Sequence, residues 1–155
     1  DYHLGQVLYT GKDFVILDFE GEPARPMSER KLKRSALRDV AGLMRSFQYA
    51  AYSALWQSST REEDRAFLER WADLWYRQLS ATFLESYLQS TAGAGFLPKK
   101  ESDLQILLEA YLLDTAGYDI GYALNHRPEW VWTPIRGCAN IWVRTPGPPQ
   151  AYGPA

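Results

Sequence analysis

Several features that would place a chain in a specialised class are scarce or missing here. Cys138 is the single cysteine in 155 residues, so an internal disulfide is excluded and a reducing, cytoplasmic setting is the simplest expectation. The 17 Lys and Arg against 19 Asp and Glu give a net charge of -2, without the basic excess of a nucleic-acid-binding domain. No apolar run approaches the ~18 residues of a membrane span, and no signal peptide precedes the first apolar segment. We therefore expect neither nucleic acid nor a membrane as a partner.

The sequence does contain enough apolar material for one packed domain, since 46% of its residues are hydrophobic. Short apolar runs at 6–9 and 14–17, separated by turn residues, predict a β-hairpin, and a proline-containing loop follows at 21–26. We expect a mainly α fold with one β-hairpin, α+β overall. Its domain would cover residues 1–143, and the Pro/Gly-rich residues 144–155 would form a disordered tail. Apolar spacings of three and four predict helices over about 35–57, 60–92 and 102–124. A fourth short helix would run from Trp130 or Pro134 to Ile141, after the break before Pro128.

Two of these helix predictions carry finer detail. Thr60 with Glu63, and Ser102 with Gln105, have the spacing of a capping box, in which a hydroxyl and a longer polar side chain satisfy the first free backbone N–H groups. The helix from Thr60 would bury one apolar stripe, made of Phe67, Leu68, Trp71, Trp75, Leu79, Phe83 and Tyr87. The next helix would bury Leu104, Leu107, Leu108, Tyr111, Leu112 and Ala116.

Three polar residues near the start of the chain have a spacing that suggests phosphoryl transfer. Protein kinases use a loop Asp to receive the proton of the acceptor hydroxyl, an amide side chain five residues later to hold magnesium, and a second Asp after a hairpin to chelate it. Asp1, Gln6 and Asp18 fit these roles in that order. Asp1 is thus the candidate catalytic base, and Gln6 and Asp18 are the candidate ligands of Mg²⁺, which prefers oxygen donors.

Other polar and aromatic residues leave alternatives open. His3 could anchor the loop or contact a substrate, and zinc binding is disfavoured because His126 is the only other histidine. Glu20 and Glu22 could bind acceptor hydroxyls or simply be solvated. Arg45, and the basic cluster between Arg25 and Arg38, could be structural or could face a ligand. The aromatic side chains that could stack on a sugar, or else pack in the core, are Tyr49, Tyr118, Tyr122 and Trp130.

The sequence resembles the maltokinase family over nearly all of the chain before the tail. The similar runs are DYHLGQVL from Asp1, DFEGEPARP from Asp18, LRDVAGLMRSF from Leu37 and the segment from Tyr122 to Trp130. Maltokinases are similar in fold to aminoglycoside phosphotransferases and protein kinases, and are often fused to a trehalose synthase. The chain departs from the family pattern at Ala36, Ala123 and His126.

The resemblance implies that the chain is the C-terminal lobe of a kinase that transfers the γ-phosphate of ATP to maltose, giving maltose 1-phosphate. It places the catalytic Asp at Asp1 and the metal-holding positions at Gln6 and Asp18. From the residues themselves we predict His3, Glu20 and Glu22 as the substrate-binding candidates. ATP and Mg²⁺ would be the cofactors, with the nucleotide-gripping residues unknown. A glycine-rich phosphate loop and a strand lysine do not precede Asp1, so the N-terminal lobe is expected to be missing and the fragment inactive alone.

Two other functions remain open from the sequence. One is a kinase of another small sugar or of an aminoglycoside. The other is a non-catalytic helical docking lobe fused to, or partnered with, trehalose synthase. An intact set of Asp1, Gln6 and Asp18 argues against the docking lobe, because packing alone does not require these polar groups at these spacings.

Overall fold

A computed structural model of the chain describes residues 2–21, 25–57 and 61–142. Helices dominate it, accompanied by one hairpin, as the sequence predicts. The elements in chain order are η1 (Leu4–Gln6), β1 (Val7–Tyr9), β2 (Phe14–Ile16), α1 (Met27–Arg30), α2 (Leu37–Gln57), α3 (Glu62–Ser90), α4 (Glu101–His126), η2 (Pro128–Trp130) and α5 (Trp132–Trp142). The predicted tail at 144–155 lies outside the described residues, so the division into lobe and tail stays a prediction.

The hairpin places Gln6 beside the residues that follow its second strand. β1 and β2 pair antiparallel, with Val7 opposite Ile16 and Tyr9 opposite Phe14, and Gly11 takes the positive φ of 90° that the turn requires. Beyond the strands, the backbone N–H of Leu17 donates to the carbonyl of Gln6 at 2.8 Å. Because the pairing continues to this point, Gln6 lies beside the residues that follow Leu17.

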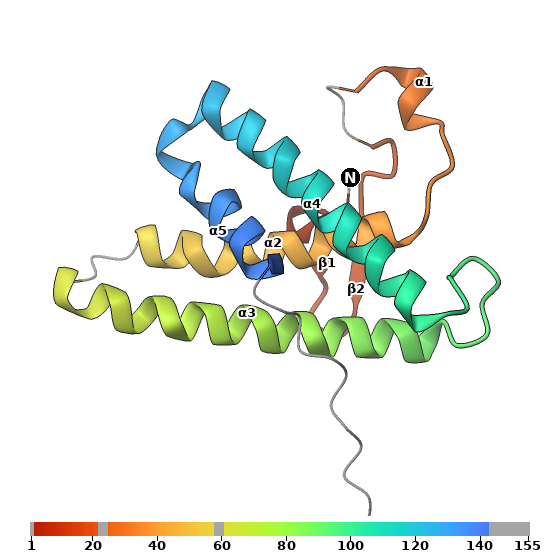
Figure 1. The fold of residues 1–155 in the computed structure, drawn as a ribbon, viewed down its shortest axis with the longest axis horizontal. Helices are drawn as coiled ribbons and strands as arrows, with labels where there is room; N and C mark the ends of the chain where they lie inside the picture. The colour runs from red at the N-terminus through yellow and green to blue at the C-terminus, as the bar shows by residue number, and fades with distance from the viewer. Residues whose placement is uncertain (1, 22–24, 58–60, 143–155) are drawn as a thin grey trace, which may run out of the picture.

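The central helix is α2, which contacts α3, α4 and α5. α3 runs antiparallel to it, α4 crosses it, and α5 folds back along α4 (Figure 1). One buried cluster joins α2 to α4, and α3 packs against it. Burying apolar side chains of this kind contributes ~1.5–3 kcal/mol each before conformational entropy is counted. The members of this cluster are Leu37, Val40, Ala41, Met44, Leu108 and Leu112.

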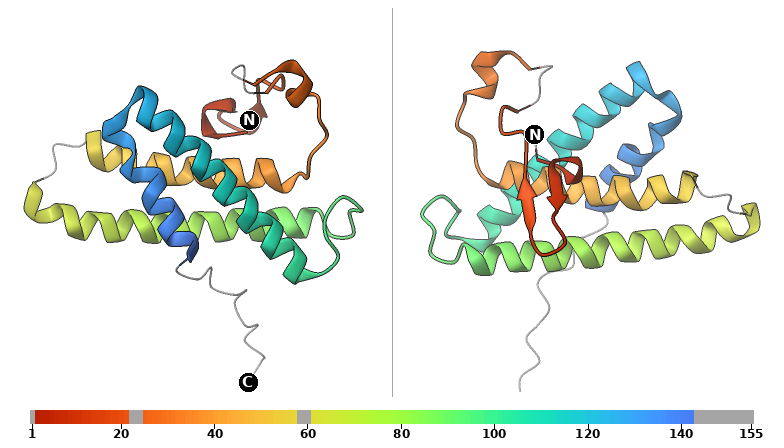
Figure 2. Two further views of the ribbon diagram at one scale, coloured as in Figure 1. Left: turned by 45° about the horizontal axis from the view of Figure 1, so that its top comes forward. Right: turned by 180° about the vertical axis from the view of Figure 1, so that it is seen from behind.

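A second buried cluster fixes the hairpin and the loop before it on the helices. Leu43 and Phe47 of α2 meet Tyr76 of α3, and Tyr2 and Val7 pack against them. From behind, the hairpin lies across α2 with its turn directed toward α3 (Figure 2). The polar start of the chain is therefore held on the bundle by apolar contacts.

The structure corrects several details of the sequence-based prediction. α4 has Lys100 as its N-cap, without a side-chain cap hydrogen bond, so the capping box predicted at Ser102 is wrong. α3 has Arg61 as its N-cap, and Thr60 of the other predicted box lies outside the described residues. The predicted stripe of α3 is wrong in its first half, because Phe67 and Trp71 are 61% and 55% exposed while Ala72, Tyr76 and Ser80 are buried. α1, a single turn that follows the proline-containing loop, was not predicted. Among the described residues, none of the helices is both long and apolar enough to cross a membrane.

Candidate active site

The loop that precedes the hairpin is fixed to α2 by its backbone. The N–H of Leu4 donates to Ser46 Oγ at 3.1 Å, and that hydroxyl donates to the carbonyl of Leu43 at 2.7 Å. At Gly42 the helix comes so close that a Cβ would stand 2.7 Å from the carbonyl oxygen of Tyr2. The glycine therefore permits a contact between helix and loop that no other residue allows. Asp1, the predicted base, is the neighbour of Tyr2 and lies outside the described residues.

Gln6 and Asp18, the two predicted metal ligands, lie together at the open end of the hairpin, away from its turn. Gln6 is 6% exposed, and its Nε2 donates to Asp18 Oδ2 at 3.1 Å. Asp18 has a φ of 60°, in the left-handed region that Asp tolerates better than bulkier residues do. Because the amide nitrogen donates to the carboxylate, the amide oxygen Oε1 is the atom of Gln6 that could coordinate a cation. Two such oxygen donors suit Mg²⁺, which completes its shell with phosphates and water.

The described residues contain no group of three His, Cys, Asp or Glu side chains able to hold a metal ion. Gln6 and Asp18 would supply an amide oxygen and one carboxylate, so their role as metal ligands stays a prediction.

The residues predicted to bind substrate separate in the structure. His3 accepts the N–H of Gly5 at Nδ1 (3.1 Å), so a neutral ring carries its proton on Nε2, and the residue lines a cavity between the loop, α2 and α4. Both roles considered for His3, anchoring the loop and contacting substrate, are thus compatible with its position. Glu20 is exposed and lines a different cavity. Glu22 lies outside the described residues. The proposed contacts of all three with substrate stay predictions.

The first cavity has a volume of about 410 Å³, within the ~300–1,000 Å³ typical of small-molecule sites. It opens beside the loop of residues 2–5, which line it. Of the aromatic residues considered for sugar stacking, Tyr49 and Tyr118 line it, whereas Tyr122 stacks on His126. Its polar lining from the helices comprises Arg38, Asp39, Arg45, Ser46, Asp114, Thr115 and Asp119.

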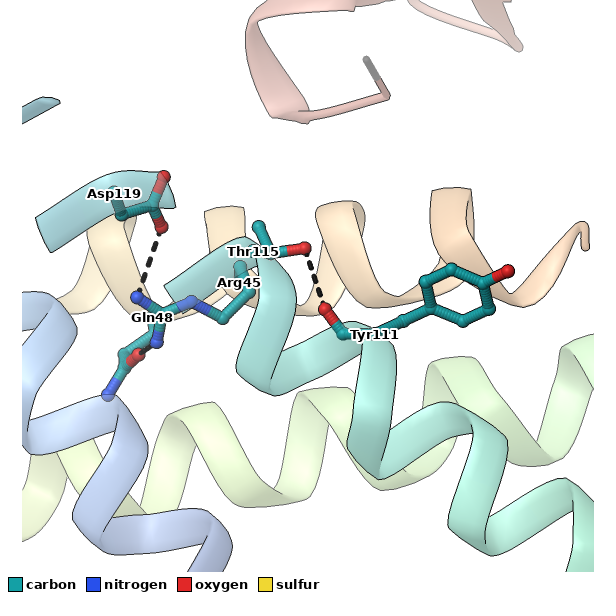
Figure 3. A network of polar contacts seen from close by, with 5 residues as sticks. All are labelled: Arg45, Gln48, Tyr111, Thr115 and Asp119. Atoms are coloured by element: carbon teal, nitrogen blue, oxygen red, sulfur yellow. Dashed lines mark hydrogen bonds and ion pairs between the residues drawn. The ribbon is translucent and has the colours of Figure 1, made fainter. Parts of the chain in front are cut away.

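Arg45 and Asp119, which both line this cavity, form an ion pair (Figure 3). Arg45 is 2% exposed; its Nη2 donates to Asp119 Oδ2 at 3.2 Å and its Nη1 donates to Gln48 Oε1. Burial raises the pKa of the Asp119 carboxyl, and the guanidinium opposes that rise by charge and hydrogen bond. Burial, helped by the charge of Asp119, raises the pKa of Tyr49 to about 12, so its phenol stays neutral and can donate.

A second cavity, of about 420 Å³, lies between the loop after Asp18, α1 and the start of α2. Arg25, Arg30, Arg34 and Arg38 line it together with Glu20, Glu29 and Asp39. Arg25 also lines the first cavity, where its guanidinium lies 5.2 Å from the ring centre of Tyr118. Part of the basic cluster seen in the sequence therefore separates two cavities and packs on an aromatic ring.

Sequence reasoning missed Asp114 and Asp119. Both lie on α4, whose apolar face was predicted correctly, and both line the first cavity. The available signal was Thr115 and Asp119, four residues apart and next to the buried stripe of Leu108, Leu112 and Ala116. Polar residues that border an apolar stripe are common, so the pattern alone does not indicate a binding site.

No family model matches the chain. A glucosamine kinase of Streptacidiphilus jiangxiensis is 27% identical over 139 residues, covering 86% of this chain and 28% of that protein. A glucosamine kinase of Mycolicibacterium smegmatis is 29% identical over 134 residues, covering 86% of this chain and 31% of that protein. The chain thus spans less than a third of the curated relatives it matches.

Solved structures give the same result. A crystal form of glucosamine kinase matches with a TM-score of 0.73 at 21% identity, over 92% of this chain and 33% of that one. A glucosamine kinase in complex with glucosamine, ADP and inorganic phosphate matches with a TM-score of 0.73 at 25% identity, over 91% of this chain and 31% of that one. The chain has a sugar-kinase-like fold. These relatives are glucosamine kinases, so they do not support the more specific resemblance to maltokinases.

Proposed function

We propose that this chain is the acceptor-binding lobe of a kinase that transfers the γ-phosphate of ATP to a hydroxyl of a small sugar. The observation that carries the proposal is the contact between Gln6 and Asp18 at 3.1 Å. Gln6 directly follows the anchored loop whose residues 2–5 line the first cavity. The likeness to glucosamine kinases supports it, because one of them is a complex with glucosamine, ADP and inorganic phosphate. A docking lobe would not need to keep this arrangement.

Phosphoryl transfer depends on positioning and on charge neutralisation more than on covalent chemistry by the protein. Asp1 would accept the proton of the attacking hydroxyl, and its neighbour Tyr2 and Leu4 are held against α2 by the contacts with Gly42 and Ser46. Gln6 Oε1 and the Asp18 carboxylate would hold Mg²⁺, which neutralises the charge of the phosphates when bound. His3 Nε2–H is available to donate to an acceptor oxygen in the adjoining cavity.

Glucosamine is the first candidate acceptor. The relatives found by sequence and by structure are glucosamine kinases, and the cavity holds the carboxylates of Asp114 and Asp119, which suit an ammonium group. Maltose, giving maltose 1-phosphate, is the second candidate, supported by the motifs shared with maltokinases at Asp1 and Asp18. In that case a fused or partner trehalose synthase would supply the sugar.

The relatives' lengths agree with the proposal that an N-terminal kinase lobe lies elsewhere in the same polypeptide. Residues 1–143 would then form the C-terminal lobe, and ATP would bind between the two lobes. On this proposal the isolated chain is expected to be inactive, because the N-terminal lobe would supply part of the ATP site.

The test is sugar-dependent ADP release by the complete polypeptide that contains this chain, with ATP, Mg²⁺ and glucosamine, glucose or maltose in turn. We expect turnover with at least one sugar, and its loss in Asp1→Asn, with circular dichroism showing that the variant is folded. General-base catalysis contributes ~10²–10⁴-fold, so the loss should be of that order. A folded wild-type protein that releases no ADP with any of the sugars would contradict the proposal, and full activity of Asp1→Asn would remove Asp1 from its role.

A further inference from the structure

We propose that Asp119 binds a hydrogen-bond donor of the acceptor through one carboxylate oxygen, while Arg45 holds the carboxylate in place through the other. This inference rests on the proposed function and adds to it a specificity-determining residue and its positioning partner. Both side chains line the first cavity, and they come from the two helices that form its wall, α2 and α4.

The Asp119 carboxylate has an unused oxygen beside the cavity. Its Oδ2 receives Arg45 Nη2 at 3.2 Å, and within the described part of the chain Oδ1 has no hydrogen-bond donor. Its side chain is 21% exposed, so it is reachable from the cavity and still sheltered from bulk water. A hydrogen bond to a partly buried carboxylate is stronger than one to a neutral acceptor, which makes this oxygen well suited to recognise a ligand.

Arg45 is held so tightly that it can fix Asp119. Its side chain is 3% exposed; Gln48 Oε1 accepts from Nη1, and the guanidinium carbon lies 5.7 Å from the ring centre of Tyr49. On the side of α5, Gly137 packs directly against it, since a Cβ there would stand 1.9 Å from Arg45 Nη1. Because the guanidinium is enclosed on these sides, it cannot move with the carboxylate. Its hydrogen bond therefore keeps the Asp119 side chain in one position (Figure 3).

Asp114 lacks this support and is therefore the weaker candidate for selectivity. It is exposed, and no hydrogen bond or ion pair to it is found in the described part of the chain. A carboxylate that rotates freely loses side-chain entropy when it binds, whereas the carboxylate of Asp119 is already oriented. The pre-oriented group is the one that can distinguish acceptors by geometry.

The hydrogen-bond donor on the acceptor sugar is either a hydroxyl or an ammonium group. Comparing two sugars as substrates distinguishes these possibilities. Glucosamine carries an ammonium group where glucose carries a hydroxyl. Asp119→Asn keeps the shape of the side chain and removes its charge. Loss of the charge weakens binding of glucosamine more than of glucose if the ammonium group is the donor, and weakens both alike if a shared hydroxyl is.

The experiment measures KM for acceptor, KM for ATP and kcat in the complete polypeptide for Asp119→Asn, Arg45→Met and the double variant. We expect Asp119→Asn to raise the acceptor KM at least tenfold, with little change in the KM for ATP. Arg45→Met should have a similar effect alone and a much smaller one when Asp119 is already Asn, because it acts through Asp119. Circular dichroism checks folding, since either single change leaves a partly buried group without its partner.

Arg136→Met is the matched control. Arg136 of α5 pairs with Glu69 of α3 at 2.8 Å, at a site that does not line the cavity, so its loss should leave the acceptor KM unchanged. An active wild-type enzyme whose acceptor KM is unchanged in Asp119→Asn would overturn the inference and leave the proposed function standing. Additive effects of Arg45→Met and Asp119→Asn would overturn the positioning role of Arg45. Absence of sugar-dependent turnover in the wild type would overturn both the function and the inference.

Discussion

Gly137 on α5 lies against the guanidinium of Arg45 on α2, so closely that a Cβ at position 137 would stand 1.9 Å from Nη1 and 2.6 Å from Gln48 Oε1. Arg45 is buried and cannot swing away, so Gly137→Ala must displace the helix or the guanidinium. We expect a loss of ~1–3 kcal/mol in the free energy of unfolding, the usual cost of overpacking, measured by urea denaturation. If Arg45 positions Asp119, the acceptor KM should rise as well.

Gly117→Ala is the control for this substitution. Gly117 lies inside α4, where a Cβ would meet no described atom within 4 Å, so alanine should raise helix stability by up to ~1 kcal/mol. Opposite signs for the two glycines are the expected result. Equal tolerance of alanine at both would mean that α5 does not approach Arg45 in this way.

Gly42→Ala tests the anchoring of the loop that begins with Asp1. Its Cβ would stand 2.7 Å from the carbonyl oxygen of Tyr2, which is backbone and cannot rotate away. We expect the loop to shift from α2, so that kcat falls at least tenfold. The free energy of unfolding should change less, because the helical core is unaffected. Ser46→Ala, which removes only the hydrogen bond to Leu4, should give a smaller decrease in kcat. Unchanged kcat in Gly42→Ala would separate the loop position from catalysis.

The helices of the bundle were predictable because their buried faces repeat at helical spacing. Leu108, Leu112 and Ala116 are buried as the sequence indicates, and the turn residues 10–13 place the hairpin correctly. The stripe of α3 misled because aromatic residues such as Phe67 and Trp71 follow the same spacing on a face that no described element covers. Hydrophobic spacing shows that a face exists, but it does not show what packs against it.

The same holds for the candidate site: contacts between residues close in sequence could be predicted, and contacts between distant residues could not. Gln6 and Asp18 could be paired from the sequence because one hairpin connects them. The pair of Arg45 and Asp119 is separated by 74 positions, so only the crossing of α2 and α4 brings the two residues together. Gly137 completes the same cluster from a third helix, which local patterns cannot predict.

Asp18→Asn tests the metal site without disturbing the backbone. Asn tolerates the φ of 60° at this position as well as Asp does, so the change removes charge and leaves the turn intact. We expect a higher Mg²⁺ concentration for half-maximal rate and a lower kcat, measured by titrating Mg²⁺ at fixed ATP in the complete polypeptide. Asp13→Asn removes the same charge from the exposed hairpin turn and should leave both quantities unchanged. A Mg²⁺ titration of Asp18→Asn that overlays the wild type would exclude Asp18 as a ligand.

Tyr52 links stability to high pH. Burial and then the hydrogen bond from its hydroxyl to Asp73 Oδ1, at 2.5 Å, raise the pKa of this phenol well above its usual 10.0. The native state therefore holds the phenolic proton more tightly than the unfolded state does. The stability contributed by this proton is fully present below pH 10 and is lost as the pH rises through the raised pKa.

Tyr52→Phe should remove both the hydrogen bond and this titration. At pH 7 we expect it to lower the free energy of unfolding by ~1–2 kcal/mol, because the bond to a carboxylate is lost. Above pH 10 the wild type should lose stability more steeply than the variant, so that the two curves converge. Urea denaturation of both proteins between pH 7 and pH 11 measures this difference. Parallel curves over that range would contradict a raised pKa of the Tyr52 phenol in the folded chain.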